Sequence, residues 1–185
     1  MITPNNFRYG IVISLEGQLY TVVGWTHVKP GKGGAYVRTK LKRMSDGNVI
    51  ERTFRSEEKI EDVRLETRNM QYLYRDGDLL YFMDTETFEQ IELNVDHLGD
   101  SFNFLAEGAN IQVQFHKGEA VGVELPPAVI LEVVSAEPGV KGDTATGATK
   151  PAKLETGYVL QVPLFIEPGD KVKVDTRSGE YLERA

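Results

Sequence analysis

The sequence contains no cysteine, which excludes disulfide bonds and thiolate metal ligands. Its three histidines, His27, His97 and His116, are far apart along the chain, so we do not predict a histidine metal cluster. No hydrophobic run approaches the roughly 20 residues of a membrane-spanning helix. The first six residues lack the basic and apolar regions of a signal peptide. These absences predict a cytoplasmic protein with no membrane partner, no metal and no cofactor.

The signatures of common catalytic sites are also absent. The chain has no G-x-S-x-G, no phosphate-binding G-x-x-x-x-G-K-[ST], no dinucleotide fingerprint and no H-E-x-x-H. Lys32 lies among glycines at a predicted hairpin tip, whereas a lysine nucleophile or base is usually activated by burial. We therefore expect that the protein is not an enzyme.

Charge is unevenly distributed along the chain, whose formal net charge is −7. Residues 1–64 hold 11 Lys and Arg against 7 Asp and Glu, a net of +4. The net charge is −9 in residues 65–126 and −2 in residues 127–185, and no Asp or Glu occurs between Gly17 and Ser45. Phosphate binding depends on local cation density rather than on whole-chain charge. The first segment is thus compatible with a nucleic-acid partner, although a solvated charged face explains the cluster equally well.

The segment without acidic residues predicts a cationic β-hairpin. Residues 19–23 and 35–41 alternate between polar and apolar and are rich in β-branched and aromatic side chains. The stretch between them has too much proline and glycine to continue a strand and forms the tip. The tip residues are Lys29, Pro30, Gly31, Lys32, Gly33 and Gly34. The exposed Lys32 is thereby accessible to another molecule's cavity or to a modifying enzyme.

Alternation places Tyr36, Arg38 and Lys40 on one face of the second strand and its apolar residues on the other. Such a face suits contacts with the backbone and bases of RNA, and cross-strand packing explains Tyr36 equally well.

A repeat with an offset of 61 residues organises the rest of the chain. Phe104, Gly108, Ile111, Val113, Gly118, Glu119 and Val121 recur as Phe165, Gly169, Val172, Val174, Gly179, Glu180 and Leu182. Seven matches in register predict two copies of one β unit of about 60 residues. Boundaries near residues 64 and 127 follow. Units of this size are near the lower limit for a self-sufficient core, so we expect stabilising contacts between them.

Three other segments allow more than one interpretation. The acidic residues from Asp84 to Asp96 lack the spacing of a calcium loop, and we interpret them as a solvated anionic face. Residues 137–151 form either a flexible crossover or a polar ligand site, where Lys141 and Lys150 would hold phosphates. At the end of the chain, Tyr181 and Arg184 suit either a splayed base or a simple strand edge.

From end to end, the chain resembles the bacterial elongation factor P family, in its lysine-tip form. The most specific stretch is Lys150-x-Ala152-x4-Gly157-x2-Leu160-x-Val162-Pro163-x2-Ile166-x2-Gly169. Residues 29–35, 142–144 and 179–181 also match. The resemblance implies an all-β fold of three small β-barrel domains in an L-shaped arrangement. An SH3-like (KOW-like) domain at 1–64 would be followed by OB-fold domains at 65–126 and 127–185.

The resemblance also implies a function. Such factors bind the ribosome between the P and E sites and stimulate peptide-bond formation when it stalls at consecutive prolines. Lys32 would approach the CCA end of the P-site tRNA, and the family usually carries a covalent extension at this position. The other expected contacts are Arg38, Lys40 and Lys42 with the tRNA backbone, Gly142, Asp143 and Thr144 with E-site mRNA, and Tyr181 and Arg184 with the tRNA elbow.

The expected partners are therefore the ribosome, P-site peptidyl-tRNA and E-site mRNA, with the factor itself a monomer. Lys32 either carries a lysyl or other amino-alkyl extension, in which case a modifying enzyme is a further partner, or is unmodified. A general single-stranded RNA-binding protein of the OB type is the alternative. It would bind free RNA tightly and with a steep salt dependence, and the −9 charge of residues 65–126 argues against it.

Overall fold

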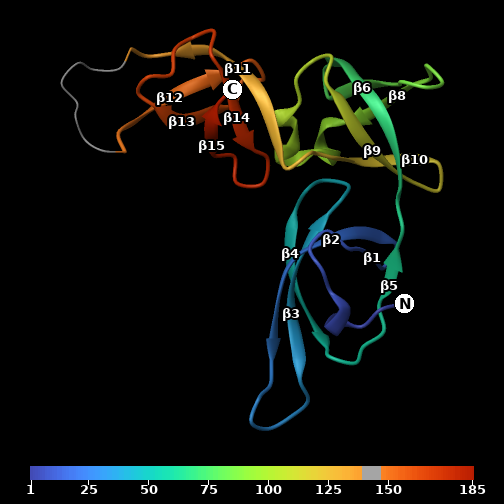
Figure 1. Ribbon diagram of the computed structural model, residues 1–185. Helices are drawn as coiled ribbons and strands as arrows, with labels where there is room; N and C mark the ends of the chain where they lie inside the picture. The colour runs from blue at the N-terminus through green and yellow to red at the C-terminus, as the bar shows by residue number, and fades with distance from the viewer. Residues whose placement is uncertain (139–146) are drawn as a thin grey trace.

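The computed structural model describes residues 1–138 and 147–185. In those residues fifteen strands form three antiparallel sheets of five strands each, and the few helical segments are short 3-10 turns. Figure 1 shows the second and third units side by side and the first unit below them, which gives the molecule an L shape. The predicted all-β fold with three units is confirmed. No helix in the described part of the chain is long and apolar enough to cross a membrane.

The first unit is a curled sheet in the order β4-β3-β2-β1-β5. Its strands are β1 (Val12–Leu15), β2 (Gln18–Val28), β3 (Tyr36–Arg43), β4 (Val49–Arg55) and β5 (Glu61–Val63), preceded by the 3-10 turn η1 (Pro4–Asn6). Glu16 and Gly17 connect β1 to β2 with φ angles of 51° and 78°, the pair of positive values that a tight hairpin turn needs. The inner face buries an edge-to-face pair of rings, Phe7 and Phe54, with centroids 5.9 Å apart.

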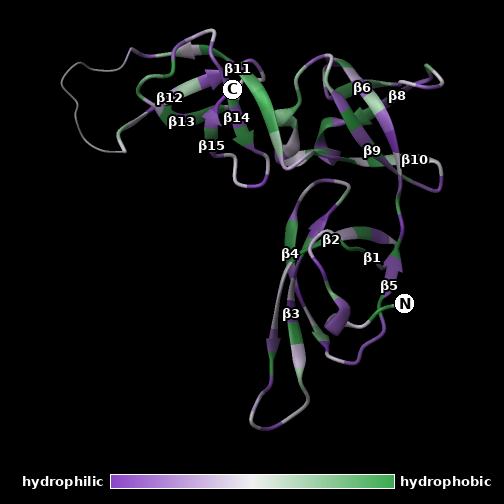
Figure 2. Cartoon of the chain, viewed as in Figure 1, coloured by the Kyte–Doolittle hydropathy of each residue, from purple (hydrophilic) through white to green (hydrophobic). Residues whose placement is uncertain are grey.

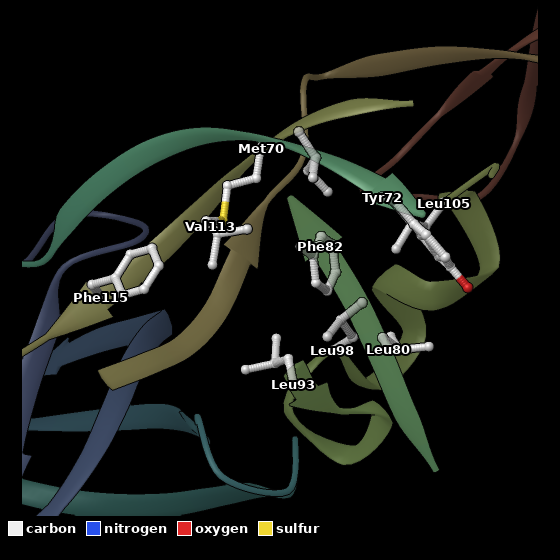
Figure 3. Packing of buried hydrophobic residues seen from close by; sticks show 10 residues of the cluster. Met70, Tyr72, Leu80, Phe82, Leu93, Leu98, Leu105, Val113 and Phe115 are labelled. Atoms are coloured by element: carbon white, nitrogen blue, oxygen red, sulfur yellow. The ribbon is translucent and has the colours of Figure 1, made fainter. Parts of the chain in front are cut away.

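The second unit has the strand order β10-β9-β6-β7-β8. Its elements are β6 (Glu66–Asp76), β7 (Leu79–Asp84), β8 (Gln90–Asn94), η2 (Val95–His97), η3 (Gly99–Phe104), β9 (Asn110–His116) and β10 (Glu119–Glu124). Edge strands β8 and β10 approach each other, so the sheet curls toward a closed barrel. Figure 3 shows side chains from β6, β7 and β9, among them Met70, Phe82 and Val113, meeting inside this barrel.

The third unit repeats this connectivity with β11 (Ala128–Ala136), β12 (Thr149–Leu154), β13 (Val159–Pro163), β14 (Lys171–Asp175) and β15 (Tyr181–Arg184). In both units the first strand is central and pairs with the second and the fourth. The registers agree as well: Met70 pairs with Ile111 across β6 and β9, and Leu131 pairs with Val172 across β11 and β14. Each pair is offset from the other by the 61 residues of the sequence repeat, so the repeat extends to strand pairing.

A few specific side chains connect the second and third units. Phe104 of the second unit is 7% exposed and belongs to the hydrophobic core of the third, where its ring meets Tyr158 edge-on at 5.2 Å. The Thr156 hydroxyl donates to the Asn103 carbonyl at 2.6 Å, and the Thr176 hydroxyl donates to the Pro126 carbonyl at 2.6 Å. These contacts supply the stabilisation between units that their small size led us to expect.

A half-open cavity of about 680 Å³ lies at the junction and is lined by residues of all three units. On one side Lys42 of β3 lies next to Gly99 of the second unit. Across the first and third units, the guanidinium of Arg177 lies 5.1 Å from the centre of the Tyr9 ring. The first unit thus contacts both of the other units, and each contact involves only a few, mostly polar, side chains.

Candidate nucleic-acid interface

The predicted cationic arm is the β2–β3 hairpin. Its strands pair from Tyr20–Arg43 to Val28–Tyr36, so β2 continues five residues beyond the predicted stretch. β4 pairs along the other edge of β3 as far as Tyr36 with Arg55. The arm is therefore supported on both sides of β3 up to the beginning of the loop, which makes it stiffer than an isolated two-stranded hairpin.

The loop at the end of the arm presents Lys32 to solvent. Its residues are exposed except for the half-buried Pro30, and Figure 2 shows no hydrophobic stretch within it. Gly33 has a φ of 104°, a conformation that L side chains rarely adopt. A side chain added at Gly31 or Gly34 would have no atom within 4 Å. Lys32 thus stands clear of the rest of the described chain.

The two faces of β3 follow the predicted alternation. Val37, Thr39 and Leu41 are fully buried, whereas Arg38 and Lys40 are exposed and Tyr36 is half-buried. The exposed face of β3 is less cationic than the sequence indicated, because β4 contributes an acidic residue. Glu51 pairs in register with Lys40, and its carboxylate lies 3.3 Å from the Arg38 guanidinium. Exposed ion pairs contribute little free energy, so a phosphate can compete with Glu51 for Arg38.

Lys42 lies at the opposite end of β3 from the tip. It is half-buried beside the junction cavity, and a side-chain carbon added at Gly99 would lie 3.7 Å from its ammonium nitrogen. Its neighbour Arg43 is bound to Asp46 at 2.8 Å, and the Tyr20 hydroxyl, followed by Asp46, raises the Arg43 pKa. Of the three predicted backbone contacts, only Arg38 and Lys40 therefore share the exposed face of the arm.

The other predicted site residues belong to the third unit, not to the arm. Tyr181 is half-buried against the third core, and Arg184 is exposed with its guanidinium 5.4 Å from the centre of the Phe165 ring. Sequence reasoning did not single out Phe165 as a site residue, and only its match to Phe104 in the repeat drew attention to it. The predicted messenger contacts Gly142, Asp143 and Thr144, together with Lys141, lie outside the described residues.

The structure contradicts the interpretation of Lys150 as a phosphate ligand. The side chain is 6% exposed, and its ammonium donates a hydrogen bond of 2.6 Å to the Glu137 carbonyl. This buried hydrogen bond joins the start of β12 to the end of β11, and the ammonium group is not available to an external anion.

Asp84 corrects the interpretation of residues 84–96 as a wholly solvated face. It is 6% exposed, and its carboxylate accepts hydrogen bonds from the backbone amides of Glu86 at 2.8 Å and Thr87 at 3.1 Å. These amides lower the Asp84 pKa by stabilising its charged form. In the part of the chain that the structure describes, no three acidic or histidine side chains are grouped to hold a metal ion.

The fold and the arm together define a class: a three-domain β factor in which two OB-type barrels carry a KOW-type barrel with a projecting cationic hairpin. Family models match the chain in this same order. The elongation factor P KOW-like domain matches residues 3–60, the elongation factor P OB domain matches residues 65–123, and the elongation factor P C-terminal domain matches residues 129–184.

Full-length relatives narrow the class. The chain is 60% identical over 185 residues to elongation factor P of Moorella thermoacetica, with 100% of both chains covered. It is 58% identical over 184 residues to elongation factor P of Thermoanaerobacter sp. strain X514, again with 100% coverage of both. The chain belongs to the bacterial elongation factor P family and is a translation elongation factor.

A solved structure supports the fold. Eukaryotic translation initiation factor 5A from Methanococcus jannaschii matches 66% of this chain and 90% of its own length, with a TM-score of 0.51 and 24% sequence identity.

Proposed function

We propose that the β2–β3 arm carries Lys32 to the CCA end of the P-site tRNA when this factor acts on a ribosome stalled at consecutive prolines. The observation that supports this proposal is the exposed Lys32 at the tip of an arm supported on both sides of β3. A charged side chain on such an arm can enter a crevice that the barrels themselves cannot. Holding the tRNA end in place accelerates peptide transfer by orientation and entropy, without chemistry on the factor.

The factor is then a ligand of the catalytic centre, not itself an enzyme, and it needs no cofactor. Arg38 and Lys40 face outward on the arm, where they would contact tRNA phosphates, whereas the half-buried Lys42 would add to the local field from the junction. Tyr181 and Arg184 would contact the tRNA elbow, and Gly142, Asp143 and Thr144 the messenger in the E site. A cytoplasmic monomer suits these roles.

Lys32→Ala tests the proposal directly. Because the side chain stands clear of the described residues, the free energy of unfolding should change by less than about 0.5 kcal/mol. Synthesis of a Pro-Pro-Pro reporter in a reconstituted system should slow about ten-fold, which corresponds to about 1.4 kcal/mol of activation free energy. Lys59→Ala, which removes another exposed lysine of the first unit, is the control. Unchanged reporter synthesis with Lys32→Ala would refute the role of Lys32.

We further propose that Lys32 carries a covalent extension installed by a separate enzyme, since an exposed amine in a glycine-rich loop is open to such an enzyme. The intact mass of the protein purified from its own cells should exceed the 20.7 kDa of the unmodified chain. Peptide mapping should place the added mass on Lys32, and Lys32→Arg should abolish it. An intact mass equal to that of the bare chain would contradict this part of the proposal.

The alternative of a general single-stranded RNA-binding protein makes a different prediction. Such a protein would bind free RNA tightly and lose affinity steeply with added salt. The acidic second unit opposes that behaviour, and we expect measurable binding only to ribosomes that carry tRNA.

A further inference from the structure

The two copies of the repeat place the same aromatic residue in opposite environments. Phe104 is 7% exposed because the third unit covers it, whereas its counterpart Phe165 is 58% exposed. No barrel follows the third unit within the described chain to cover Phe165. A single exposed apolar ring is common on protein surfaces, so what distinguishes Phe165 is the group that lies over its ring.

The group over the Phe165 ring is the Arg184 guanidinium, 5.4 Å from the ring centre. A cation over an aromatic face is attracted by the ring's quadrupole, and an arginine that stacks in this way keeps its N–H edge free for hydrogen bonds. The stacked side chain has also lost part of its rotational freedom before any ligand arrives, which lowers the entropic cost of a later contact.

Arg184 has no carboxylate within 4.0 Å among the residues whose positions the structure describes. Glu183, its neighbour on β15, is engaged by Lys173 at 3.3 Å. The acid closest in sequence is therefore occupied, and the Arg184 charge is available to an external anion.

We propose that Phe165 is a positioning residue, which holds the Arg184 guanidinium ready to bind a phosphate of the tRNA backbone. This inference rests on the proposed function, in which the third unit meets tRNA. Phosphate matches the planar, two-pronged geometry of arginine and is the repeating anion on the surface of a tRNA. Phe165 itself need not touch the RNA, since its role is to fix the direction of the guanidinium.

The test measures binding of the full-length protein to purified ribosomes that carry P-site tRNA, at several salt concentrations. Phe165→Ala should weaken binding about two- to five-fold, the range expected for loss of an exposed cation–aromatic contact. Phe165→Tyr retains the ring and should bind like the wild type. Phe88→Ala is the matched control, because Phe88 is 69% exposed and no arginine or lysine is found over its ring in the described structure.

A double-mutant comparison separates positioning from an independent contact. Arg184→Ala should weaken binding more than Phe165→Ala and should reduce the slope of log affinity against log salt by about one. The double variant should bind no more weakly than Arg184→Ala, because the ring acts through the guanidinium. Unfolding curves of all variants should match the wild type, which excludes loss of folding as the cause.

Three outcomes would overturn the inference. The first is wild-type binding by Phe165→Ala. The second is a loss with Phe165→Ala that multiplies with the loss from Arg184→Ala in the double variant, since the ring would then contact the partner independently of the guanidinium. The third is a salt slope for Arg184→Ala equal to that of the wild type, since Arg184 would then bind no phosphate. Failure of the proposed function gives a different result from failure of this inference. If the proposed function were wrong, the wild-type factor itself would not stimulate Pro-Pro-Pro synthesis.

Discussion

At Gly179 two separate constraints exclude a side chain. Its φ of 75° lies in the left-handed region, and a Cβ atom there would collide with the Tyr158 hydroxyl, which donates to the Gly179 carbonyl at 3.0 Å. Its repeat counterpart Gly118 has a φ of 82° and open space where a Cβ would be. The two glycines therefore share the backbone requirement but not the steric one.

We expect Gly118→Ala to lower the free energy of unfolding by about 1 kcal/mol, the cost of a left-handed alanine. Gly179→Ala should lower it by about 2–4 kcal/mol, because Tyr158 must also move and lose its hydrogen bond. Urea denaturation of both variants measures the difference. Equal losses would show that Tyr158 adapts without cost.

Individual residues of the arm could be predicted from the sequence because local alternation determines which face of a strand each one occupies. Lys32 and the buried Val37 are where the pattern placed them. Asp84 and Lys150 could not be predicted in this way. Their burial depends on which backbone amide or carbonyl the fold brings to them, and charged side chains are buried only when such a partner is present.

At the scale of single elements, two hairpin turns are built alike. Asp84 ends β7 and Asp175 ends β14, and each carboxylate accepts hydrogen bonds from the amides two and three residues further along. In both cases these backbone amides lower the pKa of the carboxyl group. The unfolded chain, with an ordinary aspartate pKa of about 3.9, therefore binds protons at a higher pH than the folded chain.

Stability from these turns should be fully present above about pH 5 and lost as the pH falls through 4 toward the lower folded pKa values. Asp84→Asn removes one such proton-linked group, so the fall in urea midpoint between pH 6 and pH 3 should be smaller than in the wild type. Asp78→Asn is the control, since the Asp78 side chain is 81% exposed. If Asp84→Asn left the acid sensitivity unchanged, the turn would not be its source.

Strand positions followed from alternation and turn residues, but strand partners did not. The sequence showed an arm without acidic residues, and Glu51 entered its face only because β4 pairs with β3 in one particular register. In the same way β2 extends through Gly24 and His27, residues with little strand tendency, because β3 pairs with them along the arm. Pairing between distant segments is a tertiary property that local patterns do not determine.

At the scale of the whole molecule, the stacking of Arg177 on Tyr9 joins the first unit to the third. Tyr9 is 59% exposed, so the contact is peripheral and should be worth about 0.5–1 kcal/mol. A contact of this strength restrains the angle of the first unit without locking it. Removal of the guanidinium should let the arm sample a wider range of positions relative to the other barrels.

Because the chain has no cysteine, two cysteines can be introduced at exposed lysines as unique labelling sites, Lys32→Cys on the arm and Lys153→Cys on the third unit. Single-molecule energy transfer should give a broader distance distribution with Arg177→Ala than with Arg177 intact. Arg184→Ala removes a similar stacked arginine within one unit and should leave the distribution unchanged. Superimposable distributions for Arg177→Ala would show that other contacts set the angle.

The repeat could be predicted from the sequence, but the burial of a side chain of the first copy in the core of the second could not. Phe104 and Phe165 occupy the same position of the pattern, and only the presence of a neighbouring barrel determines which one is buried. That neighbour is a feature of the assembled molecule, so no local window contains it.

Division of this chain at residue 127 would separate Phe104 from the core in which its ring is buried. The C-terminal fragment would keep its strands but would have a cavity in place of the ring. Its free energy of unfolding should fall by about 3–5 kcal/mol, the cost of deleting a buried phenylalanine side chain. The third unit therefore depends on the second for part of its core, and recombination between related factors would have to transfer the two units together.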